Sequence, residues 1–194
     1  MKSEGFFDLV LKEPKLGKAM ERFGLKKESW DKAYDDVLIL TKPLGAWDIG
    51  AAGVGNYRLN VHFEARDHWN RPCSKTVLRV DCGYLSRESA EDIYGKLVRE
   101  GGLPLLSKKE EVYKAIRLAL TKSSKLSGRL KPELIRLQPL DGFDHARNQS
   151  VLKFPHSGLG QDAYASDVAD FFAEVIYEVT DDLERVVKSL KSNP

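Results

Sequence analysis

The sequence has few of the features that mark secreted or membrane-spanning proteins. It contains only two cysteines, Cys73 and Cys82, in 194 residues, too few for the disulfide framework of a small secreted domain. No apolar run approaches the roughly 18 residues needed to cross a bilayer. Charged residues such as Glu4 and Asp8 interrupt the start of the chain, where a signal peptide has an apolar core. We therefore expect a cytoplasmic protein without a membrane partner.

A strong net charge and a phosphate-binding glycine motif are also lacking. The 31 basic and 29 acidic residues leave a formal net charge of +2, so no overall field selects nucleic acid or a membrane surface. Glycines 45, 50, 53 and 55 follow an expected helix and precede an expected strand, the reverse of the order in nucleotide-binding loops. We interpret this segment as a flexible or tightly turning connection.

Length and composition predict one globular domain over residues 1–194, because a hydrophobic fraction of 42% is ample for one buried core. Apolar stripes predict three short helices in a helical part at 1–44. The first runs around Phe6 to Val10, and the second extends from Pro14 to a stop at Gly24. The third follows Ser29 and carries Trp30 to Leu38. The sheet and its covering helix are expected at 56–194.

Two segments around residue 70 alternate between apolar and polar residues. Residues 57–66 and 76–84 each place one apolar set on one side and one polar set on the other. They predict an antiparallel hairpin whose polar face is open to solvent. A loop centred near residues 71 and 72 fixes the pairing of the two strands. In each cross-strand pair the two residue numbers should add up to about 143. Glu64 then pairs with Arg79, and His62 pairs with Asp81.

The polar face of this hairpin is a candidate catalytic site made of His62, Glu64 and Asp81. A histidine held by a carboxylate is the arrangement of general acid–base chemistry. The same pairs also suit a purely structural sheet, since opposite charges across a hairpin stabilise it by about 0.2 to 1 kcal/mol each. The hypothesis is a metal- or acid/base-dependent, nuclease-like hydrolase, although the nearest nuclease-like triplet, Glu64 to Arg66, has arginine where lysine is required.

Other candidate metal ligands are scattered. His68, Cys73 and Cys82 are close in sequence, but alternation separates Cys82 from His62, and no C-x-x-C is present. Asp141, Asp144 and His145 lie in a segment typical of turns. We assign no metal ligands, and the cofactor stays open.

A basic segment follows the hairpin. A helix with the stripe Val112, Ile116 and Leu120 is expected to begin at a capping box formed by Ser107 and Glu110. Residues 112–132 contain no acid, and their cations suit contact with a phosphate backbone. The candidate nucleic-acid-binding residues are Lys114, Arg117, Lys122, Lys125, Arg129 and Lys131.

The C-terminal part has the opposite charge. Residues 154–184 contain no lysine or arginine but eight acids, and residues 168–190 carry a wide apolar stripe at helical spacing. The basic and acidic surfaces can therefore form ion pairs with each other, within one chain or between two copies. The stripe is wider than a zipper seam, which favours packing on the protein's own sheet.

These patterns predict an α+β fold: an antiparallel sheet from two hairpins, N-terminal helices, and a long C-terminal helix packed on the sheet. The second hairpin is expected from strands near 133 and 151. The leading functional hypothesis is a cytosolic nucleic-acid-associated or regulatory protein that uses the basic segment. The alternatives are the hydrolase described above and a self-associating interaction module, a homo-oligomer joined through the long helix.

Overall fold

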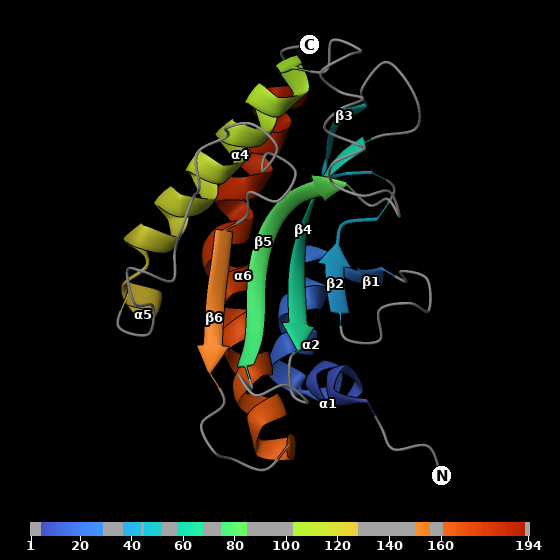
Figure 1. The fold of residues 1–194 in the computed structure, drawn as a ribbon, viewed down its shortest axis with the longest axis vertical. Helices are drawn as coiled ribbons and strands as arrows, with labels where there is room; N and C mark the ends of the chain where they lie inside the picture. Colours follow the sequence, from blue (N-terminus) through green and yellow to red (C-terminus); the bar gives the residue numbers. More distant parts are fainter. Residues whose placement is uncertain are drawn as a thin grey trace.

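A computed structural model describes residues 5–28, 37–43, 45–51, 58–67, 75–84, 103–127, 150–155 and 161–192. One antiparallel sheet lies against a layer of helices (Figure 1). The strands are β1 (Lys26–Glu28), β2 (Val37–Thr41), β3 (Asp48–Ala51), β4 (Arg58–Asp67), β5 (Lys75–Tyr84) and β6 (Ser150–Pro155). The helices are α1 (Phe6–Lys12), α2 (Pro14–Phe23), α4 (Leu103–Lys122), α5 (Ser124–Ser127) and α6 (Gln161–Ser192). The predicted α+β class is confirmed.

The sheet has the order β1-β2-β4-β5-β6, and all of its described pairs are antiparallel. β2 and β3 share one edge of β4: β2 pairs with residues 63–66, and β3 pairs with residues 58–60. The other edge of β4 pairs with β5, and β5 continues to β6. The long strand β4 is therefore an interior strand with neighbours on both sides.

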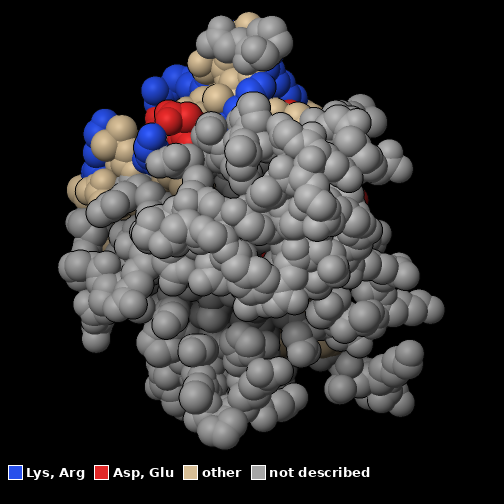
Figure 2. All heavy atoms as spheres, turned by 45° about the horizontal axis from the view of Figure 1, so that its top comes forward, with Lys and Arg blue, Asp and Glu red and all other residues tan. Residues whose placement is uncertain are grey.

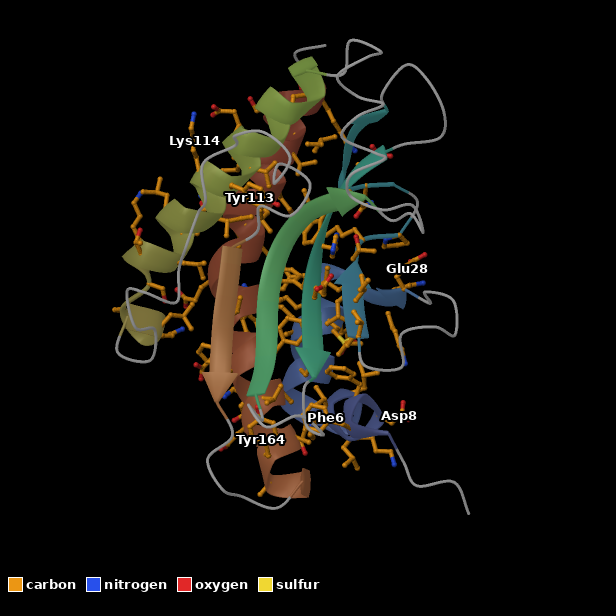
Figure 3. All side chains as sticks on the ribbon, viewed as in Figure 1. Phe6, Asp8, Glu28, Tyr113, Lys114 and Tyr164 are labelled. Carbon is orange, nitrogen blue, oxygen red and sulfur yellow. The ribbon has the colours of Figure 1, made fainter. Side chains whose placement is uncertain are left out.

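The two N-terminal helices begin and end where the sequence indicates. Pro14 begins α2, where its missing amide hydrogen costs nothing. Gly24 follows the helix with a φ of 62°, a left-handed conformation that glycine adopts without strain. The buried faces of these helices join the core shared with α6, where the ring of Phe6 stacks on that of Tyr164 at a centroid distance of 5.6 Å (Figure 3).

The third predicted N-terminal helix is wrong at its C-terminal end, because Val37 and Leu38 belong to β2. Short apolar runs fit a buried strand as well as a helix, and here pairing with β4 decides between them. The glycine-containing segment is also more ordered than expected. Its residues 48–51 form β3, which is irregular between Asp48 and Gly50.

Helix α6 lies along one face of the sheet, beside α1 and α2, and α4 runs next to it (Figure 1). The Phe172 side chain has no solvent exposure, and its ring meets that of Phe63 from β4 at 6.2 Å. The predicted packing of the long helix on the protein's own sheet is confirmed. Most of its apolar stripe is buried in the same cluster as Val61, Phe63 and Ala65.

Helix α4 has the buried stripe that the sequence predicts, with Val112, Ile116 and Leu120 fully buried. The helix begins at Leu103, however, four residues before the predicted capping box at Ser107. The apolar residues 103, 105 and 106 favour extension of the helix. Among later elements, β6 confirms the strand expected near 151 and pairs with β5. The partner strand expected from 133 and the helix expected near 90–97 lie outside the described residues.

Candidate functional site

The predicted hairpin register is confirmed along its full length. Glu64 pairs with Arg79, and His62 pairs with Asp81. The alternation of β4 and β5 carries this information because a slip by one residue would move every apolar side chain to the other face. The side chains of Arg79 and Asp81 lie outside the described part of the molecule. The described side chains on this face come from β2, from β4 and from β3, whose Asp48 pairs with Asn60.

The described part of the polar face of β4, Asn60, His62 and Glu64, is buried, contrary to the expected exposure. His62 is 2% exposed and Glu64 is 3% exposed, close to the value of zero for Phe63 on the opposite face. Alternation distinguishes two chemically different faces, but it does not report which of them meets water. We name the buried group Asn60, His62, Glu64 and Thr41 the polar cluster.

The imidazole of His62 is held by the backbone of its own strand. Its Nδ1 lies 3.1 Å from the carbonyl oxygen of Asn60. A carbonyl oxygen only accepts hydrogen bonds, so Nδ1 carries the hydrogen in this contact. Nε2 is then the ring atom that gains or loses a proton, and it lies 3.8 Å from Oε2 of Glu64. This separation is an ion-pair distance, longer than the ordinary hydrogen bond of about 2.7 to 3.2 Å.

Thr41 connects β2 to the polar cluster. Its hydroxyl oxygen lies 2.8 Å from Oδ1 of Asn60 and 3.0 Å from the carbonyl oxygen of Val61. Because the hydroxyl has one hydrogen to donate, the two acceptors share it. Thr41 was not selected from the sequence, since a helix was expected there that ends only at residues 42–45. Three of the five residues in the run "VLILT" are β-branched, and this composition indicates a strand there.

The polar cluster supplies two groups that could serve as metal ligands, His62 and Glu64. Within the described ranges, no group of three or more histidine, cysteine, aspartate or glutamate side chains lies together. His68, Cys73, Asp141, Asp144, His145 and His156 fall outside those ranges, as does the Cys82 side chain. The geometry of the cluster is that of a histidine with a fixed tautomer next to a buried carboxylate, which suits proton transfer.

The basic segment forms the outer side of α4 and α5. Lys114, Lys122 and Lys125 are exposed, and the buried side of α4 contains Val112 and Ile116. Figure 3 shows Lys114 pointing away from the molecule, whereas its neighbour Tyr113 lies on the inner side of the helix. The side chain of Arg117 and all of Arg129 and Lys131 lie outside the described residues. We name Lys114, Lys122 and Lys125 the basic face.

One cation of the basic face pairs directly with the acidic helix. Lys125 Nζ lies 3.3 Å from Oε1 of Glu178 on α6. A second, Lys114, pairs with Glu111 of its own helix at 2.9 Å. Figure 2 shows acidic side chains between basic ones at the end of the molecule where α4 meets the end of α6. The basic face is therefore mixed with acids in space, although residues 112–132 contain none.

Three other acids of α6 pair with lysines elsewhere, and Asp182 pairs with Arg185 of its own helix. Lys15 of α2 contacts Asp170 at 3.1 Å and Glu174 at 3.4 Å, and Lys42 pairs with Glu184. The hydrogen bond to Asp170 raises the pKa of Lys15 above its ordinary value of 10.5, while burial acts in the opposite direction. The expected pairing of the basic segment with the acidic helix is thus seen at Lys125 and Glu178, and a lysine of α2 and the lysine after β2 pair with α6 in addition.

Comparison with known proteins gives no relative: no protein-family model, curated protein or solved structure matches the chain. The helices within the described ranges include none that is long and apolar enough to cross a membrane.

Proposed function

We propose that this protein associates with nucleic acid in the cytoplasm through the basic face of α4 and α5. The observation that supports the proposal is the exposure of Lys114 and Lys122 on α4 and of Lys125 on α5, two helices whose inner sides are anchored in the core. Lys114 and Lys122 are eight residues apart, about 12 Å along a helix that rises about 1.5 Å per residue. Cations on such a rigid support can contact successive phosphates of one strand.

The chemistry of this face favours binding that does not depend on base sequence. Lysine ammonium groups contact phosphate oxygens as point charges and carry no information about the bases. Each contact releases counterions from the nucleic acid, so the affinity falls as salt rises. The protein then acts as a nucleic-acid-associated or regulatory factor.

The test measures binding of a labelled 20-nucleotide single strand and a 20-base-pair duplex by fluorescence anisotropy between 50 and 200 mM salt. Changing Lys114, Lys122 and Lys125 together to alanine should weaken binding and reduce the slope of log affinity against log salt by about 2 to 3, since each lost phosphate contact removes about 0.7 to 0.9.

A matched control removes the same charge elsewhere. Lys18, Lys26 and Lys27 are exposed residues of α2 and β1, and their triple alanine variant should retain most of the affinity. Two results would contradict the proposal: wild-type protein without salt-sensitive binding at 50 mM salt, or a control variant that weakens binding as much as the basic-face variant.

A second candidate function is acid–base hydrolysis at the polar cluster, favoured by the buried contact between His62 and Glu64. With Nδ1 held by the Asn60 carbonyl, Nε2 of His62 can accept a proton from an attacking water, and Glu64 can stabilise the resulting imidazolium. The substrate class that we propose is a phosphodiester, in keeping with the basic face.

Two isosteric variants test this candidate. His62→Asn keeps a donor near the position of Nδ1 and removes Nε2, whereas His62→Gln keeps an amide near Nε2 and removes the Nδ1 contact. Any hydrolysis of bis(p-nitrophenyl) phosphate or of labelled oligonucleotides should fall about 100-fold or more in His62→Asn, the typical contribution of a general base. Circular dichroism verifies the fold. Hydrolysis that survives unchanged in both variants and in Glu64→Gln would exclude the polar cluster as the site.

A further inference from the structure

The contact between Lys125 and Glu178 joins the basic face to the acidic helix at one defined point. Lys125 belongs to the short helix α5, and its side chain is 71% exposed. Glu178 belongs to α6, and its side chain is only 23% exposed. The cation can therefore reach outward to a ligand, while the carboxylate remains on a helix that is fixed in the core.

We infer that Glu178 is a built-in competitor that lowers the affinity of the basic face for a phosphate backbone. The inference rests on the proposed nucleic-acid binding. A phosphate that approaches Lys125 must draw the ammonium away from Glu178 or share it with the carboxylate 3.3 Å away. In both cases the Glu178 carboxylate, with its charge wholly or partly uncompensated, stays beside the bound polyanion. The repulsion between the carboxylate and the phosphates weakens binding.

Glu178 differs in this respect from Glu111, the described acid that contacts Lys114. Glu111 is 54% exposed and is three residues from Lys114 on the same helix. Its side chain can turn into solvent when a ligand arrives, where its charge is screened. The carboxylate of Glu178 has less freedom to do so because most of its surface is covered. Glu178 therefore sets the affinity and, with it, the salt range in which the basic face binds.

The first experiment compares Glu178→Gln with wild-type protein on the same single-stranded and duplex probes at 50 mM salt. The variant should bind about two- to fivefold more tightly, the range for removing one partner of an exposed charge pair. Its salt dependence should also be steeper, because Lys125 then releases counterions fully on binding.

Glu174→Gln is the matched control. Glu174 is on the same helix, one turn earlier, and its side chain is 24% exposed, but its partner is Lys15 of α2. The two substitutions change the net charge equally. If Glu174→Gln tightens binding as much as Glu178→Gln, the effect is one of total charge and the inference is wrong.

A double-mutant cycle with Lys125→Ala isolates the competition from simple repulsion. The loss of affinity caused by Lys125→Ala should be about two- to fivefold larger in the Glu178→Gln background than in the wild-type background. Additive effects would overturn the inference while leaving the proposed function in place. Absence of binding by wild-type protein and all variants would instead remove the proposed function itself.

Discussion

The two faces of strand β4 are equally hidden from solvent but opposite in chemistry. Val61, Phe63 and Ala65 pack in the apolar core under α6, whereas His62 and Glu64 alternate with them and are also almost fully buried. Burial of the first set stabilises the fold directly. Burial of the second set costs free energy unless each polar atom finds a partner. The comparison teaches that the apolar face stabilises the fold through burial itself, whereas the polar face does so only through the partners of its polar atoms.

The largest expected effect concerns the apolar face. Phe172→Ala should lower the free energy of unfolding by about 3 to 5 kcal/mol, because it empties a fully buried site against Phe63. Urea unfolding followed by tryptophan fluorescence measures this change. Sedimentation should give the same mass for both proteins, since the side chain packs within one chain.

The exposed apolar residue Leu118 provides the control for that measurement. Its side chain is 52% exposed on α4, so Leu118→Ala should cost less than about 0.5 kcal/mol. A Phe172→Ala protein that is nearly as stable as the parent would contradict the assignment of this face as the main source of stability.

A smaller effect is expected on the polar face. Glu64→Gln replaces a buried carboxyl group 3.8 Å from Nε2 of His62 and should cost about 2 to 3 kcal/mol, within the range for a buried polar group that loses its partner. The same urea titration measures it. If Glu64→Gln were as stable as the parent at pH 7, the carboxylate would contribute nothing to the fold, and the contrast between the two faces would be lost.

The link between β2 and the polar cluster should contribute still less. Thr41→Val removes the hydroxyl that contacts Asn60 and the carbonyl of Val61, and we expect a loss of about 1 to 2 kcal/mol. Thr180→Val is the control, because its buried hydroxyl donates only to the carbonyl of Ile176 within α6. A larger loss in the control than in Thr41→Val would show that the polar cluster needs no support from β2.

The smallest effect concerns the surface. Lys15→Met breaks the contacts to Asp170 and Glu174, and the three side chains are 46%, 44% and 24% exposed, so the loss should stay below about 1 kcal/mol after screening by solvent. The raised pKa of Lys15 sets the pH dependence of this loss. The contribution is fully present below the ordinary pKa of the ammonium and disappears as the pH rises through the raised pKa. Urea titrations of both proteins should therefore differ most at pH 8, and the difference should shrink as the pH rises above the ordinary pKa of 10.5.

Local patterns in the sequence predicted much of the fold. Pro14 and Gly24 fixed the limits of α2, and alternation together with the position of the loop fixed the pairing of His62 with Asp81. The stripe of α6 predicted its buried face. The error at Val37 and Leu38 arose because four consecutive apolar residues have no period that separates a strand from a helix.

Two members of the polar cluster were selected from the sequence, but their environment was not predicted. His62 and Glu64 were selected from their types and spacing, but their burial and the contact of Thr41 with Asn60 depend on segments far apart in the chain. Likewise, the basic and acidic segments were recognised from their composition. That Lys125 pairs with Glu178 follows only from the packing of α5 on α6.

The sequence alone determined which side chains share a face, since helical and strand periods follow from backbone geometry and require no knowledge of distant segments. Together with the position of the loop, alternation also determined the register of β4 and β5. Only the tertiary structure decided that both faces of β4 are shielded from water, and which lysine pairs with which acid of α6. Burial and long-range charge pairing depend on which surfaces meet when the chain packs. The order of residues along the chain does not state how close two distant segments lie in space.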